Sequence, residues 1–342
     1  MPEGLTLMLV AVVIIALAFD YVNGFHDAAN AIATVVSTRA LSPRQALLMA
    51  AILNFAGAFG HVAVATTMAR GLVEPEFVNR QEVILSALVG ALLWNLLTWW
   101  WGLPSSSSHA LVGGLIGAVA YHAGSLQDAV QWKNLVIKVV LPSIFAPILA
   151  ILLAFLLMCA ITWFLHLTNP RPSNVNRRFR AMQRISACLM AYSHGMADAQ
   201  KVMGIITMAL VTAKLQPVSP TGEIEIQLWV KFSCALMIAL GTSAGGWKII
   251  KTMGGKIFKL QPVHGFAADM TSSFLLHTTA SLGMPLSTTH VITGSIMGVG
   301  ASKRVSAVRW GIAKKILAAW VFTIPASATV GALTCAVIKA IV

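Results

Sequence analysis

The chain consists of long apolar runs separated by short polar segments, and these runs constrain its fold more than any other feature. The runs are Leu5–Phe19, Ala46–Ala69, Val83–Trp101, Val139–Leu165, Ile185–Ala213, Trp229–Trp247 and Ile316–Val342. Most of them reach the roughly 17–25 residues that a helix needs to span a bilayer. With 57% hydrophobic and only 10% charged residues, the sequence predicts an all-α, multi-pass integral protein of the cell inner (plasma) membrane.

The basic residues do not indicate a nucleic-acid partner, although the formal net charge is +13. They lie in short loops between apolar runs, where retention of loops on the cytoplasmic side explains them. The four cysteines stand singly in apolar segments, without the paired spacing of a disulfide framework or a zinc site. We expect no nucleic acid, no cofactor and no resident metal.

Two polar motifs occur once in each half of the chain, in the same order. The stretch "GFHDAAN" at 24–30 matches "GMADAQK" at 195–201, and "PSSSSHALVGGLIG" at 104–117 matches "PLSTTHVITGSIMG" at 285–298. Asp27 thereby aligns with Asp198, and His109 with His290. Chance similarity between Gly/Ala-rich helices is the alternative. The duplication predicts one repeat over 1–166, a basic cytoplasmic linker over 167–184 and a second repeat over 185–342.

The charges of the loops predict that the two repeats are inverted. If the N-terminus is outside, the basic segments around Arg39, 171–184, 248–259 and 303–315 all fall inside, and the slightly acidic loops 70–82 and 214–227 fall outside. Each half then has an odd number of spans, and both termini lie outside. Inverted repeats with broken helices are typical of secondary transporters, whose sites lie at the repeat interface.

The second motif predicts two re-entrant-type hairpins whose tips bind an anion. Hydroxyls precede an apolar helix in both copies, and a helix N-terminus with free N–H groups favours an oxyanion. The hydroxyl residues are Ser105, Ser106, Ser107, Ser108, Ser287, Thr288 and Thr289. Simple N-caps at exposed loops are the alternative, which the duplication makes less favourable. His109 and His290 either donate hydrogen bonds to the anion, carry protons, or are structural residues hydrogen-bonded inside the hairpins.

The first motif places carboxylates inside the membrane, where they are costly unless paired, hydrated or bound to a cation. Asn23, His26 and Asn30 surround Asp27, and Gln200 and Lys201 follow Asp198. A pair between an aspartate and Lys201 that merely joins the halves is the structural alternative.

Gly24 and Gly195 are expected to let the helices unwind and free carbonyls for a cation. Asp269, in an apolar stretch before the second hairpin, is a further candidate. Carboxylates beside an anion site make sense if a cation or proton accompanies the anion, which predicts symport.

At these residues the sequence resembles the PiT family of inorganic phosphate transporters, especially its bacterial low-affinity members. The similar stretches are "NGFHDAANAIATVVSTRAL", "LPSSSSHALVGGLIG", "YSHGMADAQKVMG" and "PLSTTHVITG". The resemblance implies inorganic phosphate as substrate, uptake driven by H+ or Na+, and a homodimer. It places phosphate at Ser105–Ser108 and Ser287–Thr289, and cation coupling at Asp27, Asn30, Asp198 and Gln200, with Asp269 at an acidic position of the family.

Two departures from the family pattern favour protons over sodium. The family's usual Asn-Asp pair reads His26-Asp27 in one motif and Ala197-Asp198 in the other. The resemblance links His26 to members that use protons and carry phosphate as a metal complex. Asn54 stands where sodium-coupled relatives often have a carboxylate.

Three other functions compete with phosphate symport. A sulfate permease of the same family would bind a similar tetrahedral oxyanion, but a carboxylate acceptor favours HPO₄²⁻, which can donate a hydrogen bond. A passive anion channel would equilibrate the anion without accumulating it. An intramembrane hydrolase is disfavoured because the HExxH motif is missing and the hydroxyls form two symmetrical sets where a nucleophile would be single. We therefore expect a transporter and not an enzyme.

Overall fold

The computed structural model describes residues 3–70, 72–74, 77, 80–217 and 225–341, and its regular elements there are helices. Parts of the loops 70–82 and 214–227 that were predicted outside thus fall beyond the described residues. The elements are α1 (Glu3–Ser37), α2 (Pro43–Gly57), α3 (Ala63–Arg70), α4 (Gln81–Trp101), α5 (Ser107–Ala123), α6 (Leu126–Ala129), α7 (Trp132–Leu135), η2 (Val136–Val140), α8 (Leu141–Thr168), α9 (Pro172–Thr212), α10 (Leu228–Ala244), α11 (Trp247–Lys251), η3 (Thr252–Lys256), α12 (Pro262–Ser281), α13 (Thr288–Lys303), η4 (Val305–Ala307) and α14 (Trp310–Ile341).

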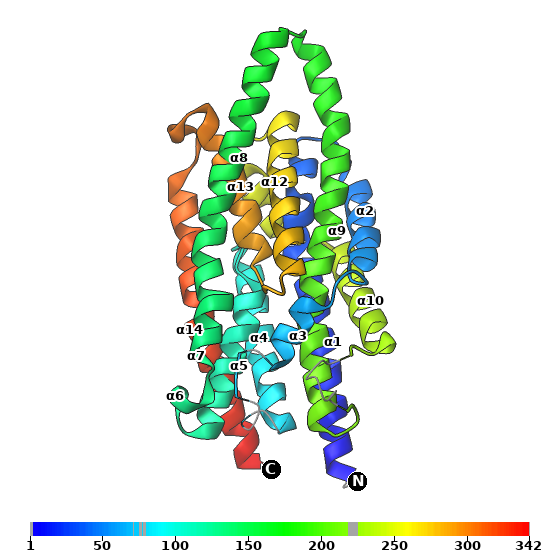
Figure 1. Cartoon of the computed structure of the whole chain (residues 1–342), viewed down its shortest axis with the longest axis vertical. Coiled ribbons are helices and arrows are strands. Elements are labelled where there is room, and N and C mark those ends of the chain that lie inside the picture. Colours follow the sequence, from blue (N-terminus) through cyan, green and yellow to red (C-terminus); the bar gives the residue numbers. More distant parts are fainter. Residues whose placement is uncertain (1–2, 71, 75–76, 78–79, 218–224, 342) are drawn as a thin grey trace.

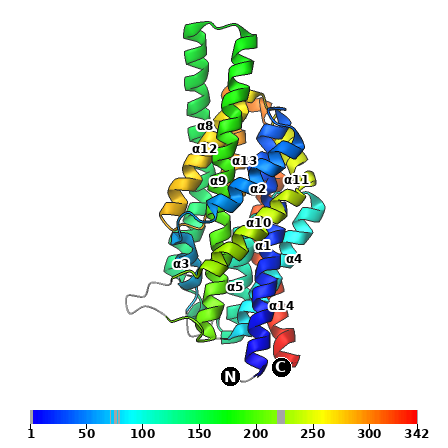
Figure 2. The same cartoon turned by 90° about the vertical axis from the view of Figure 1, so that its right-hand side faces the viewer.

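The helices form an elongated bundle whose two ends differ (Figure 1). The turn between α8 and α9 projects beyond the other helices at one end, and α1 begins and α14 ends at the other (Figures 1 and 2). Among the described residues, four helices are long and apolar enough to cross a membrane, and a bent pair adds a fifth candidate. The chain is therefore a multi-pass membrane protein.

The elements of the second half follow the same order as those of the first. α9 corresponds to α1, α10 with α11 to α2 with α3, the hairpin α12–α13 to α4–α5, and α14 to α8. The tips of the two hairpins meet inside the bundle, where the hydroxyl of Ser108 donates to the carbonyl of Leu286 at 3.3 Å. The predicted all-helical membrane fold with two re-entrant-type hairpins is confirmed.

The last helix of each half packs against the hairpin of the other half. The last helix of the second half, α14, packs against the hairpin α4–α5 of the first, and α8 packs against α12 and α13 of the second. Likewise, α1 lies against α10 and α9 lies against α2. The hairpin tips are thus held by helices from the opposite half of the chain.

The prediction that helices unwind at Gly24 and Gly195 is wrong. Both α1 and α9 continue through these glycines. The breaks lie in the next span of each half, over residues 58–62 between α2 and α3, and between α10 and α11, where the pair Leu228–Ala244 and Trp247–Lys256 bends by 61°. Gly245 at that bend has a φ of +72°, a conformation that favours glycine.

Gly24 and Gly195 instead allow two helices to cross in contact. A Cβ atom at Gly24 would collide with the backbone of Ile238 and Thr242 on α10, and one at Gly195 would collide with the backbone of Asn54 on α2. Small residues permit such close approach of membrane helices. The glycines of the first motif therefore position α1 and α9 and leave their backbone hydrogen bonds intact.

The linker predicted over 167–184 is mostly helical. α8 ends at Thr168 and α9 begins at Pro172, so only a short turn separates the two helices. Proline is favoured in the first turn of a helix because its missing N–H would be unpaired there. The basic residues after it extend α9 out of the bundle.

We predict that Gly24→Ala lowers the midpoint of thermal unfolding in detergent. The added methyl overpacks the crossing of α1 and α10, at a cost of about 1–3 kcal/mol, against a helix-propensity gain of at most ~1 kcal/mol. Gly311→Ala is the matched control, because nothing lies within 4 Å of its Cβ position. A midpoint unchanged or raised in Gly24→Ala would contradict the close crossing.

Candidate functional site

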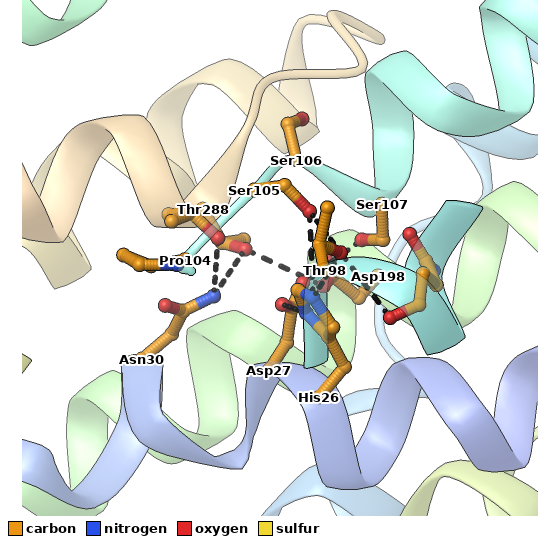
Figure 3. A network of polar contacts seen from close by, with 12 residues as sticks. His26, Asp27, Asn30, Thr98, Pro104, Ser105, Ser106, Ser107, Asp198 and Thr288 are labelled. Carbon is orange, nitrogen blue, oxygen red and sulfur yellow. Dashed lines mark hydrogen bonds and ion pairs between the residues drawn. The ribbon is translucent and has the colours of Figure 1, made fainter. Parts of the chain in front are cut away.

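The two duplicated motifs come together where α1 and α9 pass the hairpin tips (Figure 3). The polar side chains there are buried, with at most 3% of their surface exposed. The set comprises His26, Asp27, Asn30, Thr98, Ser105, Ser107, Ser108, His194, Asp198, Lys201, Thr288 and Thr289. We refer to it as the central cluster.

Asp27 connects α1 to the first hairpin tip. Nδ1 of His26 lies 2.6 Å from Oδ1 of Asp27, and the hydroxyl of Ser107 donates to Oδ2 at 2.8 Å. The other ring nitrogen of His26, Nε2, faces Oγ1 of Thr98 at 3.1 Å and Oγ of Ser105 at 3.4 Å. Hydroxyls of the first hairpin tip thus contact both Asp27 and His26.

Asp198 is paired with the one lysine of the central cluster. Nζ of Lys201 lies 2.5 Å from Oδ1 of Asp198, and the hydroxyl of Thr288 donates to Oδ2 at 3.4 Å. The ammonium also donates to Oγ of Ser108 at 2.5 Å and to the carbonyl of Leu286 at 3.2 Å. The Asp198–Lys201 pair considered from the sequence is present, and Lys201 contacts both hairpin tips.

Asn30 connects the first half to the second tip. Its amide donates to the hydroxyls of Thr288 at 3.0 Å and Thr289 at 2.9 Å. Since Asp27 on the same helix binds the first tip, α1 contacts both tips.

Gln200 and Asp269 lie outside the central cluster. Oε1 of Gln200 accepts from the backbone N–H groups of Val64 at 2.9 Å and Ala65 at 3.4 Å, at the start of α3. Asp269 on α12 accepts from the hydroxyls of Thr34 at 2.7 Å and Ser186 at 3.4 Å. The structure therefore gives Gln200 a capping contact, and it gives Asp269 a separate position between α12, α1 and α9.

Ser106 and Ser287 cap the helices that follow the tips. Ser106 accepts from the backbone N–H of His109 at 3.2 Å, and Ser287 accepts from that of His290 at 3.3 Å. These hydroxyls satisfy donors at the N-termini of α5 and α13. The N-cap alternative holds for these two residues, while the neighbouring hydroxyls reach the central cluster.

His109 and His290 face α8 and α14 behind the tips. Their ring centroids lie 4.8 Å apart, and the ring of His290 stacks on that of Trp320 at 3.8 Å. Nε2 of His109 lies 2.6 Å from the hydroxyl of Ser143 on α8. Both histidines border a cavity of about 460 Å³ that is lined mainly by apolar side chains of α8 and α14. This placement favours a structural role.

His194 belongs to the central cluster but is not among the residues predicted from sequence. It precedes Asp198 by one helical turn, an i,i+4 spacing that places both side chains on one face of α9. Nδ1 of His194 lies 3.2 Å from Oδ1 of Asn54, and Nε2 lies 3.3 Å from Oδ2 of Asp198. Ligand atoms of Asp27, His194 and Asp198 all lie within 4.8 Å of one another and could hold a metal ion.

The central cluster is suited to an anion only if a cation accompanies it. The two helix N-termini and the hydroxyls provide donors, but Asp27 and Asp198 face a single fixed positive charge, that of Lys201. A further anion here would be repelled without a proton or a metal ion on the carboxylates or histidines. The arrangement therefore fits joint binding of an oxyanion and a cation.

Comparisons with known proteins identify the relatives of this chain. Residues 23–331 match the model of the "Phosphate transporter family". A "Probable low-affinity inorganic phosphate transporter" of Bacillus subtilis (strain 168) is 48% identical over 330 residues, which cover 96% of each chain. A protein of the same description from Rhizobium meliloti (strain 1021) is 45% identical over 95% of each chain.

A solved structure shares the fold. It is described as "The sodium-dependent phosphate transporter", and it superimposes with a TM-score of 0.87 at 27% sequence identity. The match covers 98% of this chain and 100% of that chain. The arrangement of helices described above is thus that of a membrane transporter.

We predict that Lys201→Met destabilises the protein strongly, because it leaves Asp198 buried without its cation. Breaking a buried pair in this way costs about 3–5 kcal/mol. The double variant Asp198→Asn/Lys201→Met removes both charges and should recover most of the loss. Thermal or denaturant unfolding in detergent of wild type, Lys201→Met, Asp198→Asn and the double variant measures the cycle. Equal loss in the single and double variants would show that the pair does not hold this region together.

Proposed function

Because the chain belongs to the phosphate transporter family, we propose that it imports inorganic phosphate by symport with a cation, with alternating access at the interface between its halves. One observation supports this best. The two hairpin tips, one from each half of the chain, meet beside Asp27, Asp198 and Lys201. The tips supply donors for the anion, and the carboxylates supply places for the cation.

The phosphate would bind where the tip hydroxyls now contact protein groups. Ser107 and Thr288 donate to the two carboxylates, and Ser108 accepts from Lys201. These hydroxyls and the lysine could turn to an oxyanion, whose oxygens would replace the protein groups that they now contact. Asp27 or Asp198 could then accept the hydrogen bond that HPO₄²⁻ donates and that sulfate lacks, which favours phosphate over the sulfate alternative.

The contacts of the histidines support protons as the coupling cation. The hydroxyl of Thr98 donates to the carbonyl of Trp94 at 3.0 Å, so its oxygen can accept from Nε2 of His26. Both ring nitrogens of His26 therefore face oxygens that can accept a hydrogen bond, those of Asp27 and Thr98. Nε2 of His194 approaches Asp198 without a hydrogen bond, and a proton placed between them would join them.

A metal–phosphate complex is a second form of the substrate. Asp27, His194 and Asp198 offer the imidazole and carboxylate ligands that first-row divalent metals accept. The metal would enter as cargo with the anion and leave with it.

The sidedness and the homodimer stay predictions. The basic turn between α8 and α9 and the ends of the chain lie at opposite ends of the bundle, so a cytoplasmic turn would place both termini outside (Figure 1). Cysteine labelling from each side of the membrane would test this orientation, and cross-linking in native membranes would test the dimer.

The proposal is tested by uptake of radiolabelled phosphate into proteoliposomes under separately imposed proton and sodium gradients. We expect accumulation under the proton gradient that excess sulfate does not inhibit. A parallel series with a chelator or with added divalent metal shows whether a metal accompanies the anion. Equilibration without accumulation would indicate a channel, and inhibition by sulfate would indicate a sulfate permease.

We predict that Asp27→Asn and Asp198→Asn each abolish accumulation of phosphate. The amide keeps the shape of the side chain but cannot bind a proton or compensate the charge of a cation. The matched control is Asp128→Asn, the same change at an exposed residue of α6. Accumulation at the wild-type level in both variants, with all proteins equally folded in detergent, would remove these carboxylates from the coupling mechanism.

A further inference from the structure

Asp20 is a buried carboxylate that the central cluster does not include. It lies on α1 with no exposed surface, and its oxygens accept no hydrogen bond from an N–H or O–H group of the described residues, so the thiol of Cys234 is the one donor beside it there. Oδ1 of Asn23, one turn further along the same helix, is also buried and without a partner. Three acceptor oxygens on neighbouring turns of one helix thus have no N–H or O–H donor among the described residues.

The other buried aspartates of the described chain all have donors. Asp27 has His26 and Ser107, and Asp198 has Lys201 and Thr288. Asp269 has Thr34 and Ser186. Buried polar groups are normally hydrogen-bonded, so an exception requires an explanation.

The surroundings of Asp20 do not neutralise it. The titratable groups that act on it are Asp198 and Lys201 of α9 and the thiol of Cys234 of α10. Lys201 is already paired with Asp198 at 2.5 Å, and a thiol is only a weak donor. An ionised carboxylate left in this state inside a membrane is strongly unfavourable. A proton or a bound cation would remove that cost.

We propose that Asp20 and Asn23 form a binding site for one monovalent cation, a proton or a sodium ion. With a proton, the carboxyl of Asp20 can donate to Oδ1 of Asn23. With sodium, the same three oxygens supply the ligands that hard cations prefer. The site lies seven residues before Asp27, which is ~10 Å along the helix.

The position of this site gives it a role in transport, and that role rests on the function proposed above. Asp20 and Asp27 are separated by about two turns and therefore lie on nearly the same face of α1. Because Asp20 precedes Asp27 on α1, a cation held there would lie nearer the end of the bundle where α1 begins (Figure 2). Binding of this cation would neutralise the negative charge of Asp20 near Asp198, before or after the anion occupies the central cluster.

The first test compares Asp20→Asn with Asp128→Asn in proteoliposomes. Phosphate accumulation under an imposed cation gradient is measured beside phosphate exchange without a gradient. We expect the ratio of accumulation to exchange to fall about tenfold or more in Asp20→Asn, within the usual range of coupling between sites. It should stay at the wild-type value in Asp128→Asn. An unchanged ratio in Asp20→Asn would overturn the role in transport.

The second test measures the site without phosphate and therefore stands apart from the proposed function. Binding of ²²Na⁺ and the pH-dependent infrared band of protonated carboxyl groups are recorded for purified wild type, Asp20→Asn and Asp128→Asn. Loss of one sodium equivalent in Asp20→Asn identifies a sodium site, and loss of a carboxyl band identifies a proton site.

If neither signal differs between Asp20→Asn and wild type, the cation site is wrong. If Asp20→Asn cannot be purified as folded protein, Asn23→Ala replaces it in the same comparison, because this variant keeps the carboxylate. We then expect weaker sodium binding or a shifted carboxyl band. If the wild type shows the Asp20 signal but takes up no phosphate, the cation site stands and the proposal of phosphate as the substrate is wrong.

Discussion

Neutralising carboxylates inside a membrane is the constraint on which the rest of the structure depends. Asp27 is satisfied by His26 and by the first hairpin tip, and Asp198 by Lys201 and the second tip. The tips can therefore enter the bundle because α1 and α9 offer them charged partners. The same contacts are the ones that an oxyanion and a cation would take over. In the proposed function, the groups that stabilise the closed cluster are therefore also the ones that would bind the substrate.

Close packing around the tips explains the glycines of the second motif. Cβ atoms at Gly113 and Gly117 would collide with the backbone of α14, and Cβ atoms at Gly294 and Gly298 would collide with that of α8. Each of these partner helices contains an internal proline, Pro147 in α8 and Pro325 in α14. The hairpin helices α5 and α13 therefore lie in backbone contact with their partners, which fixes the height at which the hydroxyls reach the central cluster.

The sequence alone predicts the fold class and most of the cluster, because both depend on local pattern. Apolar runs show the membrane helices, and the duplicated motifs show Asp27, Asp198 and the tip hydroxyls. Other features depend on tertiary contacts. Gly24 permits a crossing with α10 where unwinding was expected, and Gln200 turns to cap α3. His194 could have been found from its i,i+4 spacing to Asp198, but its partner Asn54 comes from a distant helix.

The exchange of terminal helices between the halves has a consequence for the origin of the chain. α14 completes the packing of the first hairpin, and α8 completes that of the second. A half-length ancestor with this architecture would have lacked a cover for its own hairpin, and it would have needed a second copy, inserted in the opposite direction, to supply one. Fusion of the two genes would have made that antiparallel pair permanent. Such a fusion would leave the two halves free to diverge, as at the aligned positions Asn30 and Lys201.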